Sequence, residues 1–327
     1  MNLVVTGGAG YIGGTVATLL LQAGHKVTVV DNLCHARSEA VPEGVEFVQL
    51  DIAERSEIEA LLRRVKADGV LHFAALIEAG ESMQKPEVYF RNNSAGTLAL
   101  LEAMLAADVR RIVFSSTAAV YGEPQTVPIE ETARLAPTNA YGESKLIAEQ
   151  MLRWFERVHG FRCAVLRYFN VAGALPGRGE EHEPESHLIP LVLDAALELR
   201  PSIAIFGDDY DTPDGTCIRD YIHVVDLAEA HILALGVLEK QGSVLVNLGN
   251  GEGFSVKQVI EAARRVTGKT IAVELKPRRT GDPARLVASS GKAREVLGWK
   301  PRHARLDEII ESAWQWHRMR FGGGSKH

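Results

Sequence analysis

The segment VVTGGAGYIGG, residues 4–14, decides the fold class of this chain. It joins a short apolar run to a helical pattern, and Gly7, Gly10 and Gly13 follow G-x-x-G-x-x-G spacing. Glycines allow a tight turn and the close approach of a phosphate, and the N-terminus of the following helix offers free N–H groups and positive partial charge. The segment therefore predicts a strand–turn–helix that binds the pyrophosphate of a dinucleotide.

An acidic residue after the next strand indicates which dinucleotide is bound. The run KVTVVD, residues 26–31, ends at Asp31, about 20 residues after the glycine loop, where a carboxylate accepts the ribose hydroxyls of NAD. None of the next three residues is an arginine that would pair with a 2′-phosphate. We therefore expect NAD rather than NADP. Asp51, which ends the third predicted strand, is expected near the adenine edge.

Short apolar runs alternate with helical patterns through the first half of the chain, which predicts right-handed βαβ units. The class is therefore α/β, with a Rossmann-type doubly wound parallel sheet covered by helices on both faces. The predicted strands are residues 3–8, 26–31, 46–51, 69–75, 110–116 and 163–169, and the predicted helices are residues 11–24, 56–66, 86–107 and 140–159.

The alternation of strand and helix patterns ends at Asn170, after which a loop-rich, charged stretch begins. The later pattern predicts a smaller, mixed α/β substrate domain. Its expected elements are a helix at 187–199, a strand at 202–207, a strand–helix–strand unit at 222–248, and mostly helix over 255–321 with a strand near 270–275. We expect residues 1–172, rejoined by 222–248, to form the NAD-binding domain; 173–221 and 249–321 the substrate domain; and 322–327 a flexible tail.

Composition excludes several classes of function. The 327 residues are 46% hydrophobic and 24% charged, with a formal net charge of −6 and no block of basic residues, so neither nucleic acid nor an acidic membrane is an expected partner. The N-terminus lacks the pattern of a secretory signal, and no apolar run reaches membrane-spanning length. We expect a cytoplasmic protein.

Cysteines and acidic loops give no metal or disulfide pattern. Cys34, Cys163 and Cys217 lie far apart, which argues against structural zinc and disulfides and favours a reducing compartment. The acidic stretch DDYDTPDG, residues 208–215, places Pro213 where a calcium loop needs a ligand. We expect no metal site.

The segment NAYGESK, residues 139–145, holds a candidate acid/base pair. Asn139 is a suitable helix cap, and the spacing of four places Tyr141 and Lys145 on one helical face. A fixed ammonium beside a phenol favours the phenolate and lowers its pKa, so the tyrosine can take a proton from a sugar hydroxyl. Thr117, with Ser115 and Ser116, ends the fifth predicted strand, where parallel sheets bind ligands.

These motifs together resemble the extended short-chain dehydrogenase/reductase superfamily, and within it the UDP-glucose 4-epimerase family. The resemblance covers nearly the whole chain. It includes TGGAGYIG, VVDNL, HFAA, NNSAGT, FSSTAAVYG, YGESK and RYFNVAGA. It also includes RRTGDPARLVASS, and the most specific part is IFGDDYDTPDGTCIRDYIHVVDLA.

The resemblance implies a role for each matching residue. Tyr141 is the catalytic acid and base, Lys145 lowers its pKa and holds the nicotinamide ribose, and Thr117 shares the proton. The NAD site comprises Gly7, Gly10, Tyr11, Ile12, Gly13, Asp31, Asn32, Asp51, Ile52, Phe73, Ala74, Ala75, Asn92, Ser115, Tyr141, Lys145 and Phe169. The UDP-sugar site comprises Thr117, Asn170, His187, Leu188, Ala204, Phe206, Arg219, Arg279 and Asp282.

The implied reaction is a transient oxidation of UDP-glucose at C4 by retained NAD, followed by return of hydride to the opposite face to give UDP-galactose. The resemblance also implies a homodimer formed through residues 86–107 and 140–159. Ile77 and His187 depart from a lysine and an asparagine found in some members. Leu286 stands where a tyrosine narrows the sugar pocket in others, and its intermediate size leaves UDP-N-acetylglucosamine open as an alternative substrate.

Two rival functions are weighed against this one. A sugar-nucleotide 4,6-dehydratase carries Asp-Glu after the strand-end threonine, where this chain has Ala118 and Ala119. An NAD-sensing binder without turnover typically loses the Tyr/Lys pair, whereas this chain keeps Tyr141, Lys145 and Thr117. Both comparisons favour the epimerase.

Overall fold

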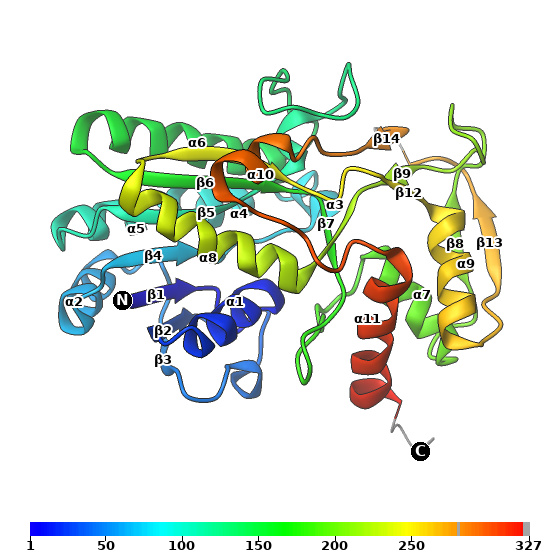
Figure 1. Ribbon diagram of the computed structural model, residues 1–327, viewed down its shortest axis with the longest axis horizontal. Coiled ribbons are helices and arrows are strands. Elements are labelled where there is room, and N and C mark those ends of the chain that lie inside the picture. Colours follow the sequence, from blue (N-terminus) through cyan, green and yellow to red (C-terminus); the bar gives the residue numbers. More distant parts are fainter. Residues whose placement is uncertain (280–281, 323–327) are drawn as a thin grey trace.

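Seven parallel strands form the central sheet of the computed structural model, which describes residues 1–279 and 282–322. The strand order is β11-β6-β5-β4-β1-β2-β3, and the order reverses direction between β1 and β4. The prediction of a doubly wound parallel sheet is therefore confirmed (Figure 1). The strands are β1 Asn2–Thr6, β2 Lys26–Asp31, β3 Glu46–Gln49, β4 Gly69–His72, β5 Arg111–Thr117, β6 Arg162–Tyr168 and β11 Val244–Leu248.

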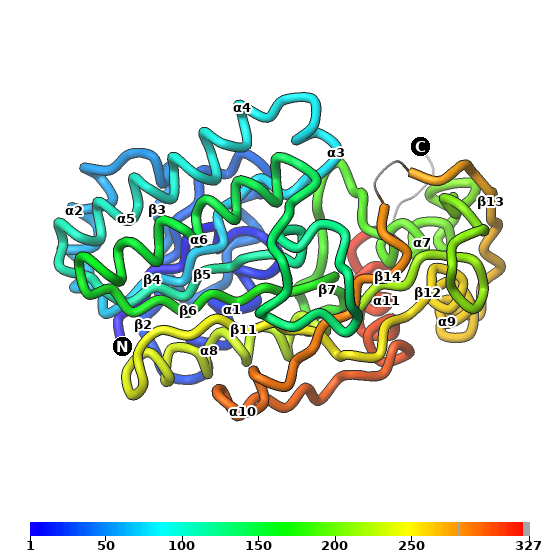
Figure 2. Tube along the Cα trace, turned by 90° about the horizontal axis from the view of Figure 1, so that it is seen from above, coloured from blue at the N-terminus to red at the C-terminus, as the bar shows by residue number. Residues whose placement is uncertain are grey.

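Helices cover both faces of this sheet (Figure 2). On one face lie α1 (Tyr11–Gln22), α8 (Val224–Lys240) and α10 (Gly291–Leu297); on the other lie α2 (Arg55–Val65), α5 (Gly96–Ala106) and α6 (Ala140–His159). Strand β1 shows why both faces are apolar. Leu3 and Val5 enter the core under α1 and α8, while Val4 enters the core under α2 and α5.

A smaller unit lies beside the carboxyl ends of the sheet strands, at the right of Figure 1. It has its own core, which includes Ile189, Val192, Ile260 and Ile309. The elements that build it are α7 Leu188–Ala196, the parallel pair β8 Ile203–Phe206 and β13 Val273–Lys276, α9 Val256–Thr267 and α11 Leu306–Phe321. The two-domain division stays a prediction. Helix α10, which the prediction assigns to the substrate domain, contributes to the core of the central sheet.

Short strands connect the two units. β7 (Asn170–Ala172) pairs in parallel with β10 (Tyr221–His223), and β9 (Ile218–Arg219) lies between β12 (Phe254–Ser255) and β14 (Arg285–Leu286). The prediction that the strand–helix–strand unit at 222–248 rejoins the sheet is right for β11 and wrong for β10. β10 is displaced because its hydrogen-bonding edge is taken by β7, which directly follows β6 in the chain.

The single helix expected over residues 86–107 is a helix with a wider turn inside it. It consists of α4 (Pro86–Tyr89), the π-helical segment η2 (Phe90–Ala95) and α5, and it begins at Pro86 as predicted. Such π segments often occur at functional sites. Here the segment aims Asn93 at the loop after β4, where its amide bonds both the N–H and the C=O of Leu76.

The remaining predictions differ mainly at element ends. The fourth strand stops at His72, and helix α7 spans 188–196 rather than 187–199. The other short elements are η1 Ser38–Ala40, α3 Ala79–Ser82 and η3 Ala118–Tyr121. Of the predicted tail, residues 323–327 lie outside the described residues. No helix within 1–279 and 282–322 is both long and apolar enough to cross a membrane.

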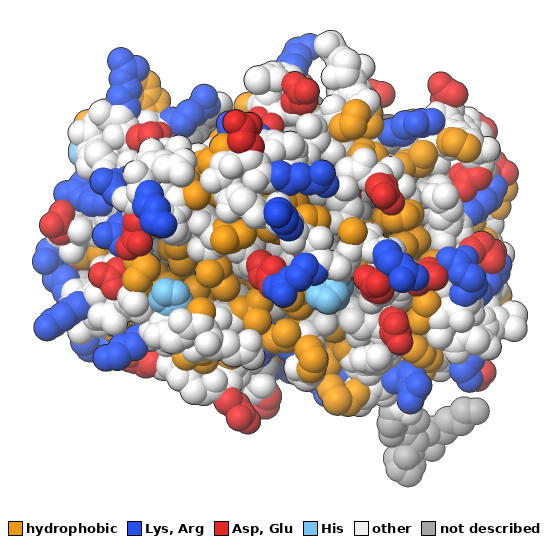
Figure 3. Space-filling view, in the orientation of Figure 1, with side chains coloured by type: hydrophobic (Ala, Val, Ile, Leu, Met, Phe, Trp, Pro, Cys, Tyr) orange, Lys and Arg blue, Asp and Glu red, His pale blue; other side chains and the backbone are white. Residues whose placement is uncertain are grey.

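Acidic and basic side chains lie interspersed over the face of the molecule drawn in Figure 3, with apolar side chains between them.

Candidate active site

A cleft opens at the carboxyl ends of β1, β2, β4 and β5, at the topological switch point of the sheet. The glycine loop forms one wall. Gly7 has φ +70°, and a Cβ there would lie 2.5 Å from the backbone nitrogen of Ala74, so the two loops can approach only with glycine. Gly13 is similarly constrained, since its Cβ would lie 2.3 Å from the Gly7 carbonyl oxygen.

Nearly all of the predicted cofactor residues line this cleft. They are Gly7, Gly10, Tyr11, Ile12, Gly13, Asp31, Asn32, Asp51, Ile52, Phe73, Ala74, Ala75, Asn92, Ser115, Tyr141 and Lys145. The exception is Phe169, which is buried in a separate cluster with Tyr121, Ile129 and Leu146. Phe169 follows the last residue of β6, so it turns away from the cleft that its neighbour Tyr168 lines.

Backbone donors fix the Asp31 carboxylate opposite the glycine loop. Its two oxygens accept hydrogen bonds from Ala9 N at 3.1 Å and from Leu33 N at 2.9 Å. Beside it, the Asn32 amide donates to Asp51 at 2.7 Å. The ends of β2 and β3 are thus cross-linked by polar side chains, and the carboxylate stands where the ribose hydroxyls of a dinucleotide can donate to it.

Helix α6 presents the candidate acid/base pair to the same cleft. Asn139 caps the helix, since its side-chain oxygen accepts from Gly142 N at 2.8 Å. Lys145, one turn beyond Tyr141, is only 3% exposed, and its Nζ lies 4.6 Å from the centroid of the Phe114 ring. Thr117 ends β5, close enough to the Tyr141 phenol for its hydroxyl to lower the pKa of that phenol. The capped helix and the strand end therefore bring all three predicted catalytic residues together.

Burial dominates the protonation of this pair. It raises the pKa of the Tyr141 phenol, against the hydrogen bond from Thr117, and the charge of Glu78 raises it further. Burial also lowers the pKa of Lys145 to about 7, against the nearby charge of Glu149. Burial, Thr117 and Glu78 are the groups that act on the phenol here, so the expected lowering of the Tyr141 pKa by Lys145 stays a prediction.

A buried polar network lies behind the pair. The Glu149 carboxylate accepts from the Ser116 hydroxyl at 2.5 Å and from Arg167 Nε at 2.9 Å. Arg167 also donates to the Tyr121 hydroxyl at 3.0 Å, which in turn donates to Asn247 at 2.7 Å. These contacts tie α6 to β5, β6 and β11. They hold the face that carries Lys145 at a fixed distance from the sheet.

A second cleft lies in the smaller unit, and Asn170, which lines it, is two residues from Tyr168, which lines the first. The predicted substrate residues Asn170, His187, Leu188, Ala204, Phe206, Arg219, Arg279 and Asp282 all line it, whereas Thr117 stays beside Tyr141. Arg279 stacks on the Phe206 ring, 3.9 Å from its centroid, and Arg219 pairs with Asp282. Two guanidinium groups thus face one cleft, a pattern suited to a diphosphate.

The model of the NAD dependent epimerase/dehydratase family matches residues 3–249. The chain belongs to this family. The resemblance inferred from the motifs is thereby confirmed, as is NAD as the cofactor.

Relatives within the epimerase/dehydratase family match the chain over almost its full length. A UDP-glucose 4-epimerase from Halalkalibacterium halodurans is 52% identical, over 97% of this chain and 96% of the relative. One from Streptomyces lividans is 53% identical, over 96% and 95%. A solved UDP-glucose 4-epimerase from Stenotrophomonas maltophila, with bound NAD and formylated UDP-arabinopyranose, is 42% identical and superposes with a TM-score of 0.96, covering 99% of this chain and all of that one.

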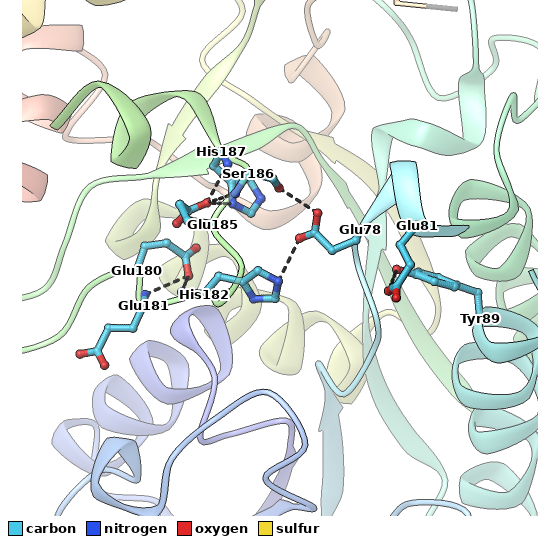
Figure 4. A network of polar contacts seen from close by, with 9 residues as sticks. All are labelled: Glu78, Glu81, Tyr89, Glu180, Glu181, His182, Glu185, Ser186 and His187. Atoms are coloured by element: carbon cyan, nitrogen blue, oxygen red, sulfur yellow. Dashed lines mark hydrogen bonds and ion pairs between the residues drawn. The ribbon is translucent and has the colours of Figure 1, made fainter. Parts of the chain in front are cut away.

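Sequence reasoning missed several side chains in the NAD cleft of this family member. Glu78, Glu180 and His182 also line the cleft, and Figure 4 shows Glu78 between His182 and Ser186. The charged stretch at 172–186 was visible in the sequence, but nothing there indicated that it returns to the end of β4. Within the part of the chain that the structure describes, no three His, Cys, Asp or Glu side chains gather as metal ligands do.

Proposed function

We propose that the chain interconverts UDP-glucose and UDP-galactose through a transient 4-keto sugar, as an isomerase with tightly bound NAD. One observation carries the proposal. Tyr141, Lys145 and Thr117 meet at the carboxyl end of the sheet, and two residues after Tyr168 of the cofactor cleft the chain enters the lining of a cleft with two arginines. The names of relatives about half identical over nearly the whole chain support the same activity.

The acid/base work falls to Tyr141. Bound NAD would supply a reversible acceptor for the C4 hydride. Tyr141 takes the proton of the 4-hydroxyl and later returns it, and Thr117 shares that proton through its hydrogen bond. Since burial raises the pKa of the phenol, positive charge must act on it during turnover, and Lys145, one helical turn away on α6, supplies that charge when protonated.

The second cleft holds the UDP part and leaves the hexose free to turn over. Arg219 and Arg279 pair with the diphosphate, while Asn170, His187, Leu188, Ala204, Phe206 and Asp282 surround the nucleoside and the ends of the diphosphate. Because the keto sugar must present either face to the cofactor, binding energy is best placed on the UDP group and kept away from the ring.

UDP-N-acetylglucosamine is a second candidate substrate. Leu286 on β14 lies in register with Arg219 and packs against the cluster that contains Phe169 and Leu146. Its size is intermediate between a residue that would close the sugar pocket and one that would admit an N-acetyl group, so both sugars belong to the proposal.

The rival functions fit less well. After Thr117, Ala118 and Ala119 open η3, so the acid and base that a 4,6-dehydratase needs at these positions are missing. A binder without turnover has no use for a buried lysine one turn from a tyrosine beside Thr117. The proposal also includes a homodimer, as the family resemblance implies, acting in the cytoplasm, as the composition leads us to expect.

The direct test is incubation of the purified chain with UDP-glucose and no added cofactor, followed by separation of the UDP-hexoses by chromatography. Appearance of UDP-galactose supports epimerisation by retained NAD. If NAD is bound and neither UDP-glucose nor UDP-N-acetylglucosamine is converted, the substrate assignment is wrong.

A further inference from the structure

A charged segment crosses the mouth of the cofactor cleft. We call residues 178–187, between β7 and α7, the strap. Its members Glu180 and His182 line the cofactor cleft, and they also line a second cavity that adjoins it around Gly10 and Tyr11. The strap therefore forms a partition between the place expected for the dinucleotide and the outer cavity.

The near end of the strap is anchored on α1 and on the segment after β2. Arg178 donates to the carbonyl oxygen of Ala40 and packs so closely on α1 that a Cβ at Gly14 would lie 2.2 Å from its Nη1. His182 stacks on His35, with ring centroids 6.0 Å apart. These contacts place the first half of the strap over the pyrophosphate-binding turn.

The middle of the strap is held from outside by α11. Trp316 donates its indole N–H to the carbonyl oxygen of Glu180 at 3.2 Å, and Arg320 pairs with Glu181 at 2.9 Å. The Glu180 carboxylate turns inward and accepts from the backbone N–H groups of Glu181 and His182. This local turn fixes the direction in which His182 leaves the strap.

The far end is held by a single carboxylate, Glu78, from the loop after β4 (Figure 4). One of its oxygens lies 2.9 Å from His182 Nε2, and the other accepts from the Ser186 hydroxyl at 2.8 Å. Both side chains of the ion pair are mostly buried, with 16% exposure for His182 and 23% for Glu78. Glu78 thus ties two points of the strap to the opposite wall of the cleft.

We propose that the strap retains the bound NAD, and that the contacts of Glu78 with His182 and Ser186 keep it closed. A dinucleotide lying under the strap can leave only when these contacts break. Glu78 is in this sense a positioning residue for cofactor retention. The inference rests on the proposed function, in which the same NAD molecule serves successive turnovers.

Charge at the pair gives the strap a pH dependence. The nearby Glu78 carboxylate and the charge of Glu180 raise the pKa of His182, against burial and the charge of His187, and His35 is the group that faces it from the segment after β2. Because the pKa is raised, the ion pair is complete at low pH and loses its charge as pH rises through the pKa of His182. NAD release should therefore accelerate over that rise.

The test measures the release rate of NAD. The purified chain is loaded with radiolabelled NAD, diluted into excess unlabelled NAD, and sampled by filtration. Glu78→Gln should release NAD about tenfold faster than the parent chain, since a charge-assisted contact is lost. The matched control is Glu183→Gln on the same strap, whose 82% exposed carboxylate meets only the surface Arg37, and it should release NAD at the parent rate.

Two further readouts separate the strap from general damage to the fold. His182→Gln should also accelerate release, and the double variant no more than Glu78→Gln, because the contact between Glu78 and His182 is lost in all three. The rise in release rate with pH should disappear in Glu78→Gln. The proposal that the strap retains NAD would be overturned by release within twofold of the parent rate in both single variants. A rise in release rate with pH that persists in Glu78→Gln would overturn it as well. A chain that holds no NAD at all would overturn the proposed function with it.

Discussion

Tyr141 has a pKa that burial raises, although its proposed role needs the phenolate. Replacement of its hydroxyl separates binding from chemistry. Tyr141→Phe should keep bound NAD, since the ring still lines the cleft, while turnover falls by a factor on the order of 10²–10⁴. Chromatographic assay of UDP-hexose conversion, with NAD quantified after denaturation, checks both. Near-normal turnover would remove Tyr141 from the mechanism.

The buried Lys145 should make the stability of the folded chain depend on pH. Its folded pKa of about 7 lies below the unfolded value near 10.4, so the folded state disfavours the charged form. This penalty to the free energy of unfolding is complete below pH 7. It shrinks as pH rises from about 7 to 10, the range in which Lys145 stays protonated only in the unfolded chain. Lys145→Met should therefore raise the melting temperature most at pH 6, with a difference that shrinks towards pH 10. A difference in melting temperature that grows with pH would contradict the claim that burial disfavours the charged form of Lys145.

At the element scale, the contacts that join helix α6 to the sheet fix the position of Tyr141 and Lys145. The pair of Glu149 and Arg167 joins α6 to β6, and each side chain is 3% exposed. Glu149→Gln leaves a buried guanidinium without its charge partner, which should cost about 3–5 kcal/mol in the free energy of unfolding by urea. The double variant Glu149→Met/Arg167→Met is the control, because it removes both charges. If the double variant were the less stable of the two, the cost of Glu149→Gln would not come from the unpaired guanidinium.

Local rules could predict α6 in full from the sequence, but not everything around it. Asn139 as a cap, Tyr141 and Lys145 at helical spacing, and Asp31 at a strand end all follow from contacts within one element. The contact between Glu78 and Ser186 spans 108 positions and depends on how the strap folds back, which no local pattern encodes. Similarly, β10 pairs with β7 and not with the sheet, because that choice is made by tertiary contacts.

At the scale of the whole molecule, the helices expected to form a dimer expose apolar side chains. On α6, Trp154 and Val158 are 61% and 62% exposed, and Leu98 on α5 is 38% exposed. Trp154→Glu would place a charge in the proposed interface and should convert a dimer into a monomer, measured by sedimentation equilibrium. The control is Met319→Glu, on the equally exposed surface of α11. A parent chain that sediments as a monomer would refute the dimer.

The proposed use of the two clefts also predicts the path of the hydrogen at C4 of the sugar. If NAD accepts hydride in the first cleft while the second holds the UDP group, the same hydrogen returns to the sugar without meeting solvent. Epimerisation of UDP-glucose in deuterium oxide, with the product examined by mass spectrometry and NMR, tests this claim directly. The account predicts UDP-galactose without deuterium at C4. Deuterium at C4 would mean that the carbon exchanges a proton with water, and would contradict the transient oxidation on which the account rests.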